Sequence, residues 1–242
     1  MNFHVGTSGY SYPEWKGTFY PAKMPAKQML GFYGSHFRTV EINNTFYRPP
    51  TAQLLETWAA QVPANFRFVL KAPQEITHVK RLAGVGEMVS SLFEAAVTLK
   101  ERLGPVLFQL PPNFKKDVPR LREFLTMLPK CRAAFEFRHA SWFDDEVFTL
   151  LREHGVGMCV ADAGDDLEVP FVSTADFGYL RLRRPDYDDT ALAAWAKQMR
   201  SQAWRDCFVF FKHEDAGAGP RMASRLLELL AEGTPVQRKR AA

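Results

Sequence analysis

The sequence predicts one α/β domain in which eight parallel strands close into a TIM-like (β/α)8 barrel. Eight short apolar runs are spaced along the 242 residues, amphipathic segments separate most of them, and no linker rich in Pro, Gly or Ser divides the chain. Alternation of strands and helices is typical of a parallel sheet. Eight such units in a chain of this length match the usual size of a closed barrel.

The strands are expected where β-branched, aromatic and other apolar residues cluster between turn signals. In the second of them Val40 and Ile42 alternate with polar Glu41, which predicts one face against helices and one toward the barrel axis. The expected strands are 3–8, 39–43, 67–72, 105–110, 133–138, 157–162, 178–183 and 207–212.

Amphipathic helices are expected in most of the connections between these strands. Thr51 can cap one helix, and Gly104 is expected to end another. The first connection predicts only a short helix near 28–37, and the connection between the sixth and seventh strands is too short for a full one. The other expected helices are 51–62, 88–104, 118–128, 144–155, 189–200 and 219–233.

A doubly wound open sheet is the alternative architecture. Such sheets usually have fewer strands and a glycine-rich phosphate turn after the first strand. The corresponding segment here, "GTSGYSY", contains Gly6 and Gly9 but lacks the third glycine of the dinucleotide motif. The barrel is therefore favoured, and no cofactor is expected.

Composition excludes several classes of protein. The three cysteines are widely separated and form no CxxC, which argues against a disulfide framework or a zinc knuckle. No apolar run approaches the ~20 residues of a membrane span, and no signal peptide is visible. We expect a cytoplasmic protein without a membrane partner. The formal net charge is +4, and the basic tail from about residue 236 is interpreted as a solvated end.

Polar residues recur near the carboxyl ends of the expected strands, in the phase opposite to the helix-facing residues. The carboxyl ends of parallel strands meet at one end of a barrel, where barrel enzymes hold their active sites. Three acidic and five basic residues are expected there, with a cation from Arg138 or Lys71 beside Glu136. The full inward set is Glu41, Lys71, Gln109, Glu136, Arg138, Asp162, Arg181, Arg183 and Lys212.

Two interpretations of this set stay open. The charges could satisfy one another and plug the barrel, because desolvated charges are costly unless paired. They could instead line a cationic pocket for a small phosphorylated or carboxylated metabolite, such as a sugar phosphate or a nucleotide, and this second interpretation is favoured. Glu41 or Glu136 would then be the general base of a hydrolase, lyase or isomerase, with Lys71, Arg138 and His139 as further catalytic candidates. An anion is expected between Arg181, Arg183, Lys212 and the helix start at 217–219.

Two other functions remain as alternatives. A nucleic-acid-binding surface could use Lys80, Arg81, Lys115, Lys116 and Arg184. A metal-dependent hydrolase could use Glu41, Glu136, His139, Asp162 and His213, but neighbouring cations would compete for the carboxylates, so no metal is expected. Aromatic residues in the loops could cap the barrel or stack on a sugar or base: Tyr10, Tyr12, Trp15, Phe46, Tyr47, Trp142 and Phe143.

Six motifs resemble the family called domain of unknown function 72, or YecE-like. They are "GTSGYSYPEWKGTFYP", "VEINNTFYRPP", "FVLKAPQEITHVKRL", "LFQLPPNF", "FEFRHASWF" and "YLRLRRPDY". The resemblance implies a TIM-like barrel and no particular activity. It also implies a shared site of Tyr10, Trp15, Glu41, Asn43, Phe46, Tyr47, Lys71, His78, Gln109, Glu136, Arg138, His139, Trp142 and Arg181.

This chain departs from the family pattern at two places. Arg183 stands where a histidine is usual, and Lys212 and His213 stand where amides are usual. Both departures add basic groups, which favours an anionic ligand and argues against a role that needs the usual histidine as a proton shuttle.

Overall fold

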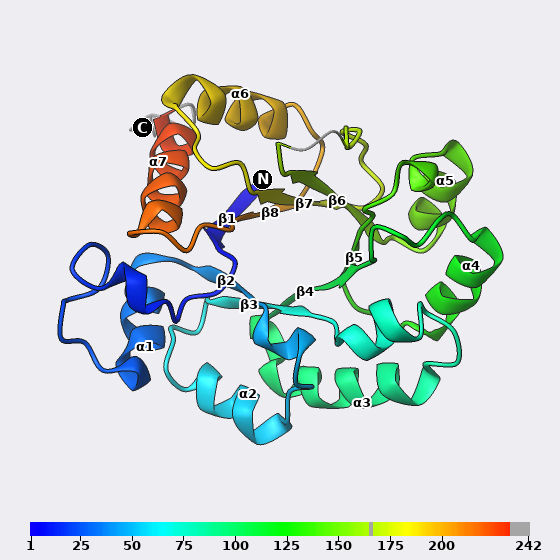
Figure 1. The fold of residues 1–242 in the computed structure, drawn as a ribbon, viewed down its shortest axis with the longest axis horizontal. Helices are drawn as coiled ribbons and strands as arrows, with labels where there is room; N and C mark the ends of the chain where they lie inside the picture. The colour runs from blue at the N-terminus through cyan, green and yellow to red at the C-terminus, as the bar shows by residue number, and fades with distance from the viewer. Residues whose placement is uncertain (165–166, 233–242) are drawn as a thin grey trace, which may run out of the picture.

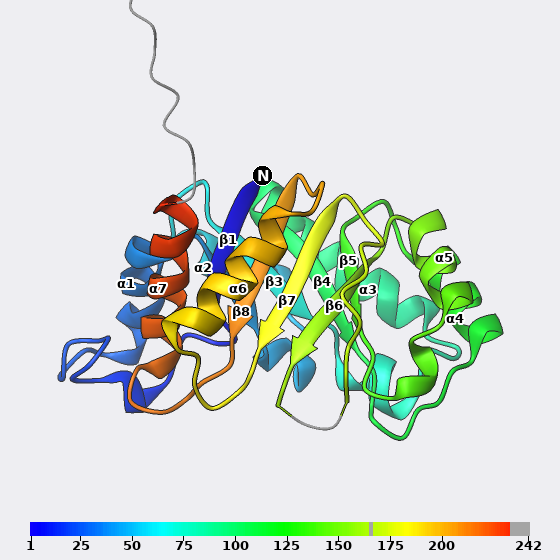
Figure 2. The same cartoon turned by 90° about the horizontal axis from the view of Figure 1, so that it is seen from above.

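The computed structural model describes residues 1–164 and 167–232, so the basic tail lies outside the described residues. All eight expected strands are present and form one parallel sheet. Figure 2 shows the arrowheads of β6 and β7 directed toward the same end of the molecule. The strands are β1 (Asn2–Thr7), β2 (Thr39–Ile42), β3 (Arg67–Lys71), β4 (Leu103–Gln109), β5 (Ala133–Glu136), β6 (Gly157–Asp162), β7 (Phe177–Leu182) and β8 (Asp206–Phe211).

The sheet curls into a nearly closed barrel, which confirms the predicted fold class. Hydrogen-bonded neighbours follow the order β1-β8-β7-β6-β5-β4-β3-β2. The two ends of this order, β1 and β2, meet through an isolated parallel bridge between Ser8 and Glu41. The amide of Gly9 donates to the Glu41 carbonyl at 2.7 Å. We call this β1–β2 junction the seam.

A tyrosine hydroxyl strengthens the seam below that bridge. The Tyr33 hydroxyl accepts from the Thr7 amide at 2.9 Å and lies 3.0 Å from the Thr39 carbonyl, to which it donates. The backbones come so close here that a Cβ on Gly6 would lie 2.2 Å from the Thr39 carbonyl oxygen. Glycine at position 6 is therefore needed for the strands to approach.

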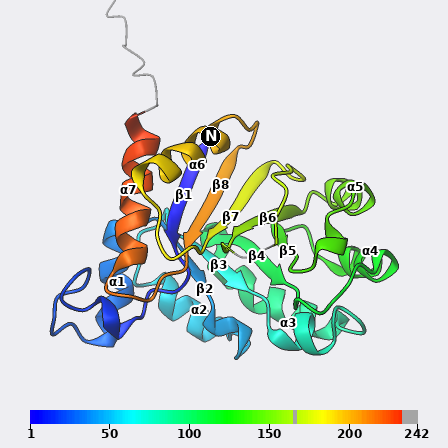
Figure 3. The same cartoon turned by 45° about the horizontal axis from the view of Figure 1, so that its top comes forward.

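Helices surround the sheet on its outer face (Figures 1 and 3). Their hydrophobic faces pack on the helix-facing residues of the strands, so the main core lies between the sheet and the helices. They are α1 (Ala26–His36), α2 (Ala52–Ala59), α3 (Gly86–Ala96), α4 (Val118–Met127), α5 (Asp145–Glu153), α6 (Asp189–Arg200) and α7 (Ala218–Glu232).

Two connections between strands differ from the regular strand–helix alternation. The described residues between β6 and β7 form no helix, as expected. The expected helix 88–104 is wrong in its second half, because α3 ends at Ala96 and a 3-10 segment follows over Val97–Arg102, with Lys100 at a φ of 51°. Gly104 lies inside β4 rather than ending a helix; a Cβ there would lie 3.0 Å from Val69 Cγ2.

The barrel interior is divided into an apolar layer and a polar layer. The apolar layer consists of Val69, Leu107, Ala134, Cys159, Phe177, Tyr179, Phe208 and Phe210, all buried. Several of these residues precede a polar residue by two positions on the same strand: Val69 precedes Lys71, and Ala134 precedes Glu136. Because residues two apart point to the same face, the polar layer lies directly beyond the apolar one, toward the carboxyl ends. Among the described residues, no helix has the length and apolar character needed to cross a membrane.

Candidate functional site

The polar layer is built around one arginine and two carboxylates, and we call Glu41, Glu136 and Arg181 the charged layer. Arg181 Nη2 donates to Glu41 Oε1 at 2.8 Å, and its Nη1 donates to Glu136 Oε2 at 2.5 Å. The three side chains are at most 2% exposed. One guanidinium from β7 therefore joins the carboxylates of β2 and β5 across the barrel interior.

Neutral donors satisfy the remaining carboxylate positions. The Ser8 hydroxyl donates to Glu41 Oε1 at 2.7 Å, and the Tyr179 hydroxyl donates to Glu41 Oε2 at 2.5 Å. Gln109 Nε2 donates to Glu136 Oε1 at 2.8 Å. All four carboxylate oxygens thus have partners, which is the condition under which buried charges are stable.

Sequence reasoning missed Tyr179, a member of the apolar layer whose hydroxyl bonds to the charged layer. It lies two residues before Arg181 on β7, so the alternation that pointed Arg181 inward also pointed Tyr179 inward. Burial, followed by the charge of Glu41, raises the pKa of the Tyr179 hydroxyl, which keeps it a hydrogen-bond donor.

The expected cation partner of Glu136 is confirmed only in part, because Arg138 forms a long ion pair with it but is not the main partner. Neither Arg138 nor Lys71 is its closest partner, because Arg181 occupies that place. Arg138 Nε and Arg183 Nη1 both lie 3.7 Å from Glu136 Oε1. Arg138 follows the end of β5 by two residues and lies further toward solvent than Glu136, with 30% of its side chain exposed. The main partner, Arg181, comes from β7 on another part of the barrel wall. The alternation of residues along one strand does not predict contacts between strands.

The pKa of Glu136 combines two opposing effects. Burial raises it, but the charge and hydrogen bond of Arg181, together with the charges of Arg183 and Arg138, outweigh burial and hold it at about 2. Glu136 therefore stays ionised at neutral pH, and it is a weak proton acceptor there.

This depressed pKa predicts a specific acid sensitivity. A carboxyl whose folded pKa lies below its unfolded value stabilises the fold above the unfolded pKa, and this stabilisation is lost as pH falls through the folded pKa. We expect Glu136 to contribute about 3 kcal/mol above about pH 5 and to lose it toward about pH 2. Urea unfolding across this range should show a steeper acid loss for the parent than for Glu136→Gln. Parallel pH profiles would contradict the assignment.

Asp162 was expected to face the barrel axis, and this is wrong. Its neighbour two residues earlier, Val160, packs in the helix-facing core, and so does its register partner Leu182. Asp162 Oδ1 instead accepts from Arg184 Nε at 2.7 Å, and Oδ2 accepts from the Tyr187 hydroxyl at 3.1 Å. The inward charges are consequently two carboxylates and five cations, an excess of three positive charges.

Four of these cations lie at the mouth, beyond the charged layer, and we call Lys71, Arg138, Arg183 and Lys212 the rim cations. Lys71 is 9% exposed, and its Nζ lies 3.9 Å from the centroid of the Phe46 ring. Burial, followed by the charge of Arg181, lowers its pKa to about 8. Burial, followed by the charges of Arg183 and Arg181, also lowers the pKa of Lys212. Neighbouring positive charges thus lie close enough to Lys71 and Lys212 to make their protonated forms less favourable.

The aromatic residues expected at the mouth divide into two groups. Trp15 and Trp142 are fully buried, and Trp142 Nε1 donates to the Phe114 carbonyl at 2.7 Å, so both belong to the core. Tyr47 is 69% exposed. Tyr10 and Tyr47 line a cavity of about 560 Å³ beside the β2 end, together with Asn44, Thr45, Arg48, Pro49, Leu54 and Trp58.

Three other expected site residues have local roles. His139, expected as catalytic, accepts from the Ser141 amide at its Nδ1 (3.1 Å) and so caps the short helix Ala140–Trp142. His78 packs edge-on against the Phe46 ring, 4.9 Å between centroids. Asn43 lies beside Gly9 and Tyr10 at a small cavity of about 90 Å³.

The start of α7 offers less to an anion than its glycines suggested. The amide of Ala218 already donates to the Asp215 carbonyl at 2.7 Å, and Pro220 has no amide hydrogen. A Cβ on Gly219 would lie 3.1 Å from the His213 carbonyl oxygen and 3.3 Å from Thr7 Cγ2. Close packing of α7 on β1 therefore accounts for Gly219 without a ligand.

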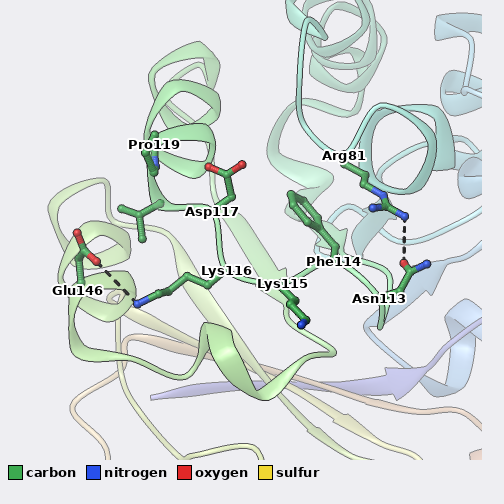
Figure 4. A pocket seen from close by; sticks show the side chains of 9 residues that line it. Arg81, Asn113, Phe114, Lys115, Lys116, Asp117, Pro119 and Glu146 are labelled. Carbon is green, nitrogen blue, oxygen red and sulfur yellow. Dashed lines mark hydrogen bonds and ion pairs between the residues drawn. The ribbon is translucent and has the colours of Figure 1, made fainter.

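A surface cavity of about 670 Å³ lies beside the start of α4, among the loops that follow β3 and β4, and its charged lining consists of Arg81, Lys115, Lys116, Asp117 and Glu146 (Figure 4). Lys116 Nζ lies 3.0 Å from Asp144 Oδ2, and Arg81 Nη2 donates to Asn113 Oδ1 at 3.3 Å. Lys115 also lines the cavity. Of the five residues expected for a nucleic-acid surface, this site contains Arg81, Lys115 and Lys116, and a neighbouring carboxylate partly neutralises Lys116.

The residues considered for a metal do not come together. Arg181 engages Glu41 and Glu136, Arg184 engages Asp162, and His213 Nε2 bonds to the Arg184 carbonyl. Within residues 1–164 and 167–232, no three His, Cys, Asp or Glu side chains are grouped so that they could hold a metal ion.

Comparison with known proteins relates this geometry to one family. The family model described as "Protein of unknown function DUF72" matches residues 4–242. The UPF0759 protein YunF of Bacillus subtilis is 28% identical over 94% of this chain and 94% of its own length. The UPF0759 protein YecE of Escherichia coli K12 is 29% identical over 66% of this chain and 59% of its own length.

Solved structures show the same architecture. A DUF72 family protein from Thermotoga maritima superposes with a TM-score of 0.85 at 27% identity, covering 96% of this chain and all of that one. A DUF72 family protein from Enterococcus faecalis superposes with a TM-score of 0.80 at 20% identity, covering 95% of each chain. The second likeness shows the fold alone.

Proposed function

This chain belongs to the DUF72 family of proteins of unknown function, and we propose from its barrel mouth that it binds a small anionic metabolite. In this proposal the phosphate or carboxylate group of the ligand lies between the rim cations. The charged layer beneath them is the structural floor of the site rather than its catalytic machinery.

The excess of positive charge at the mouth carries the proposal. Arg181 offsets one of the two carboxylate charges of the charged layer, so a single net negative charge faces the four rim cations. Lys71 and Lys212 both have pKa values lowered by burial and by neighbouring cations. An anion between them would relieve this repulsion, and charge-assisted hydrogen bonds from arginine add geometric specificity.

The floor role follows from the chemistry of Glu136. Its low pKa makes it a weak base at neutral pH, so in this proposal it fixes Arg181 instead of accepting a proton from the ligand. The floor in turn keeps the rim arginines oriented, because Arg138 and Arg183 each lie 3.7 Å from Glu136 Oε1.

Calorimetric titration tests the proposal directly. We expect inorganic phosphate, glucose 6-phosphate or AMP to bind the parent protein, and Arg183→Gln to weaken this binding by about tenfold or more. Arg184→Gln is the matched control: Arg184 is adjacent in the chain but is 55% exposed and paired with Asp162. Absent heats for all three probes, or equal affinities for both variants, would contradict the proposal.

Nucleic-acid binding is the second candidate, and the surface cavity beside the start of α4 is the observation that favours it (Figure 4). Asp144 offsets part of its charge through Lys116, and Asp162 pairs with Arg184. A single-stranded oligonucleotide in the same titration separates the two functions. Binding that Lys115→Gln weakens and Arg183→Gln leaves unchanged would favour the nucleic-acid surface over the mouth.

A further inference from the structure

Lys71 differs from the other rim cations in both position and surroundings. It ends β3, its side chain is almost fully buried, and its Nζ lies on the face of the Phe46 ring. The two arginines of the rim cannot act as nucleophiles, because a guanidinium stays protonated in proteins. Lys71 is therefore the most enclosed amine among the rim cations.

Resting on the proposed function, we infer that Lys71 forms a Schiff base with a carbonyl group of the ligand. The substrate class is a small carbonyl compound that carries a carboxylate or phosphate. Arg138, Arg183 and Lys212 would hold the anionic group, and Lys71 would attack the carbonyl carbon.

The reaction balances without an oxidant or a reductant. The neutral amine of Lys71 attacks the carbonyl carbon; a C–N bond forms, the carbonyl oxygen gains a proton and the nitrogen loses one, which gives a carbinolamine. Loss of water then breaks the C–O bond and leaves the C=N bond. The products are the imine and one water molecule.

In this inference His78 moves these protons through Nε2, because its Nδ1 lies 2.9 Å from the Thr77 hydroxyl. Its ring contacts the same Phe46 ring as Lys71 Nζ, so both groups meet around one aromatic side chain. Burial, followed by the charges of Lys71 and Arg138, lowers the pKa of His78 and favours the neutral imidazole. A neutral imidazole can accept the proton from the attacking nitrogen and return it to the departing oxygen.

Several charged groups set the protonation of Lys71. Burial and the cations Arg181 and Lys212 lower its pKa, whereas Glu41 and Glu136 raise it, and the balance is about 8. The Phe46 ring also attracts the ammonium form. Since Glu41 and Glu136 are already bonded to Arg181, they offset the lowering of the Lys71 pKa only in part.

Reductive trapping tests this inference. We expect pyruvate with sodium borohydride to modify Lys71 selectively, with a rate that rises through about pH 8 as the amine loses its proton. Near pH 7, the neutral fraction of an amine with this pKa exceeds that of an ordinary lysine by on the order of a hundredfold. Peptide mass spectrometry should therefore find the adduct at Lys71 ahead of the exposed lysines.

Two variants distinguish the role of Lys71 as a nucleophile from its role as a positive charge. Lys71→Arg keeps a cation, so we expect it to lose the selective adduct while its phosphate affinity falls less than that of Arg183→Gln. Lys130→Met, at an exposed position before β5 and at the opposite end of the barrel, should leave both unchanged. Equal labelling of Lys71 and Lys130 in a protein that binds phosphate would overturn the Schiff-base inference alone. Loss of both phosphate binding and labelling in the parent would overturn the proposed function as well.

Discussion

Arg181→Ala is expected to lower the free energy of unfolding by about 3–5 kcal/mol. The substitution leaves Glu41 and Glu136 buried at the centre of the barrel without the cation that bonds both of them. Buried carboxylates without a partner must either remain as costly charges or bind protons. Urea or guanidinium unfolding at neutral pH, followed by circular dichroism, measures the change.

Two comparisons identify the cause of this loss. Arg225→Ala removes an arginine that also bonds two carboxylates, Asp189 and Glu228, but on the surface, and the expected effect is much smaller. Adding Glu41→Gln and Glu136→Gln to Arg181→Ala should recover part of the lost stability, because no buried charge then lacks a partner. Equal losses for Arg181→Ala and Arg225→Ala, or no recovery, would contradict the charged layer as described.

Gly6→Ala is expected to destabilise the barrel by about 3 kcal/mol. The new Cβ would lie 2.2 Å from the Thr39 carbonyl oxygen and 2.8 Å from the Tyr33 hydroxyl. The first of these atoms is backbone, so relief requires β1 and β2 to separate rather than one side chain to rotate. Thermal or denaturant unfolding of the variant measures the loss.

Gly86→Ala is the matched control for this glycine. Gly86 begins α3, and a Cβ there would meet open space within 4 Å. We expect a change within about 1 kcal/mol, and in the stabilising direction if helix propensity decides it. Equal destabilisation by both substitutions would contradict the close contact at the seam as the cause of the cost of Gly6→Ala.

The strands were predictable from the sequence because runs of apolar residues coincide with segments that are buried in the structure. Residues 67–71 and 207–211 are apolar runs bounded by turn signals, and both form strands that are almost wholly buried. The break after α3 was not predictable in this way. The amphipathic period continues past Ala96, but the chain must turn into β4, and Lys100 adopts a positive φ to do so.

The candidate site was predictable only where the alternation of residues along a strand indicates which side chains face the barrel interior. Glu41, Glu136 and Arg181 follow from their position between helix-facing residues. The prediction for Asp162 was wrong because Ala161, the residue before it on β6, is the one that faces the barrel interior. The pairing of Arg181 with both carboxylates joins residues 140 and 45 positions apart, and that geometry depends on barrel closure, which no local pattern encodes.

The seam has a consequence for how the barrel moves. Strand β1 pairs with β8 over six residues, from Asn2 with Asp206 to Thr7 with Phe211, but it meets β2 through a single bridge. Local opening between β1 and β2 therefore breaks few backbone hydrogen bonds, and amide hydrogen exchange at Gly9 should precede exchange in the β1–β8 ladder. That bridge ends on Glu41, a member of the charged layer. The seam therefore includes a residue of the floor of the proposed site. A fluctuation that separates β1 from β2 is expected to displace Glu41 and so to disturb that floor.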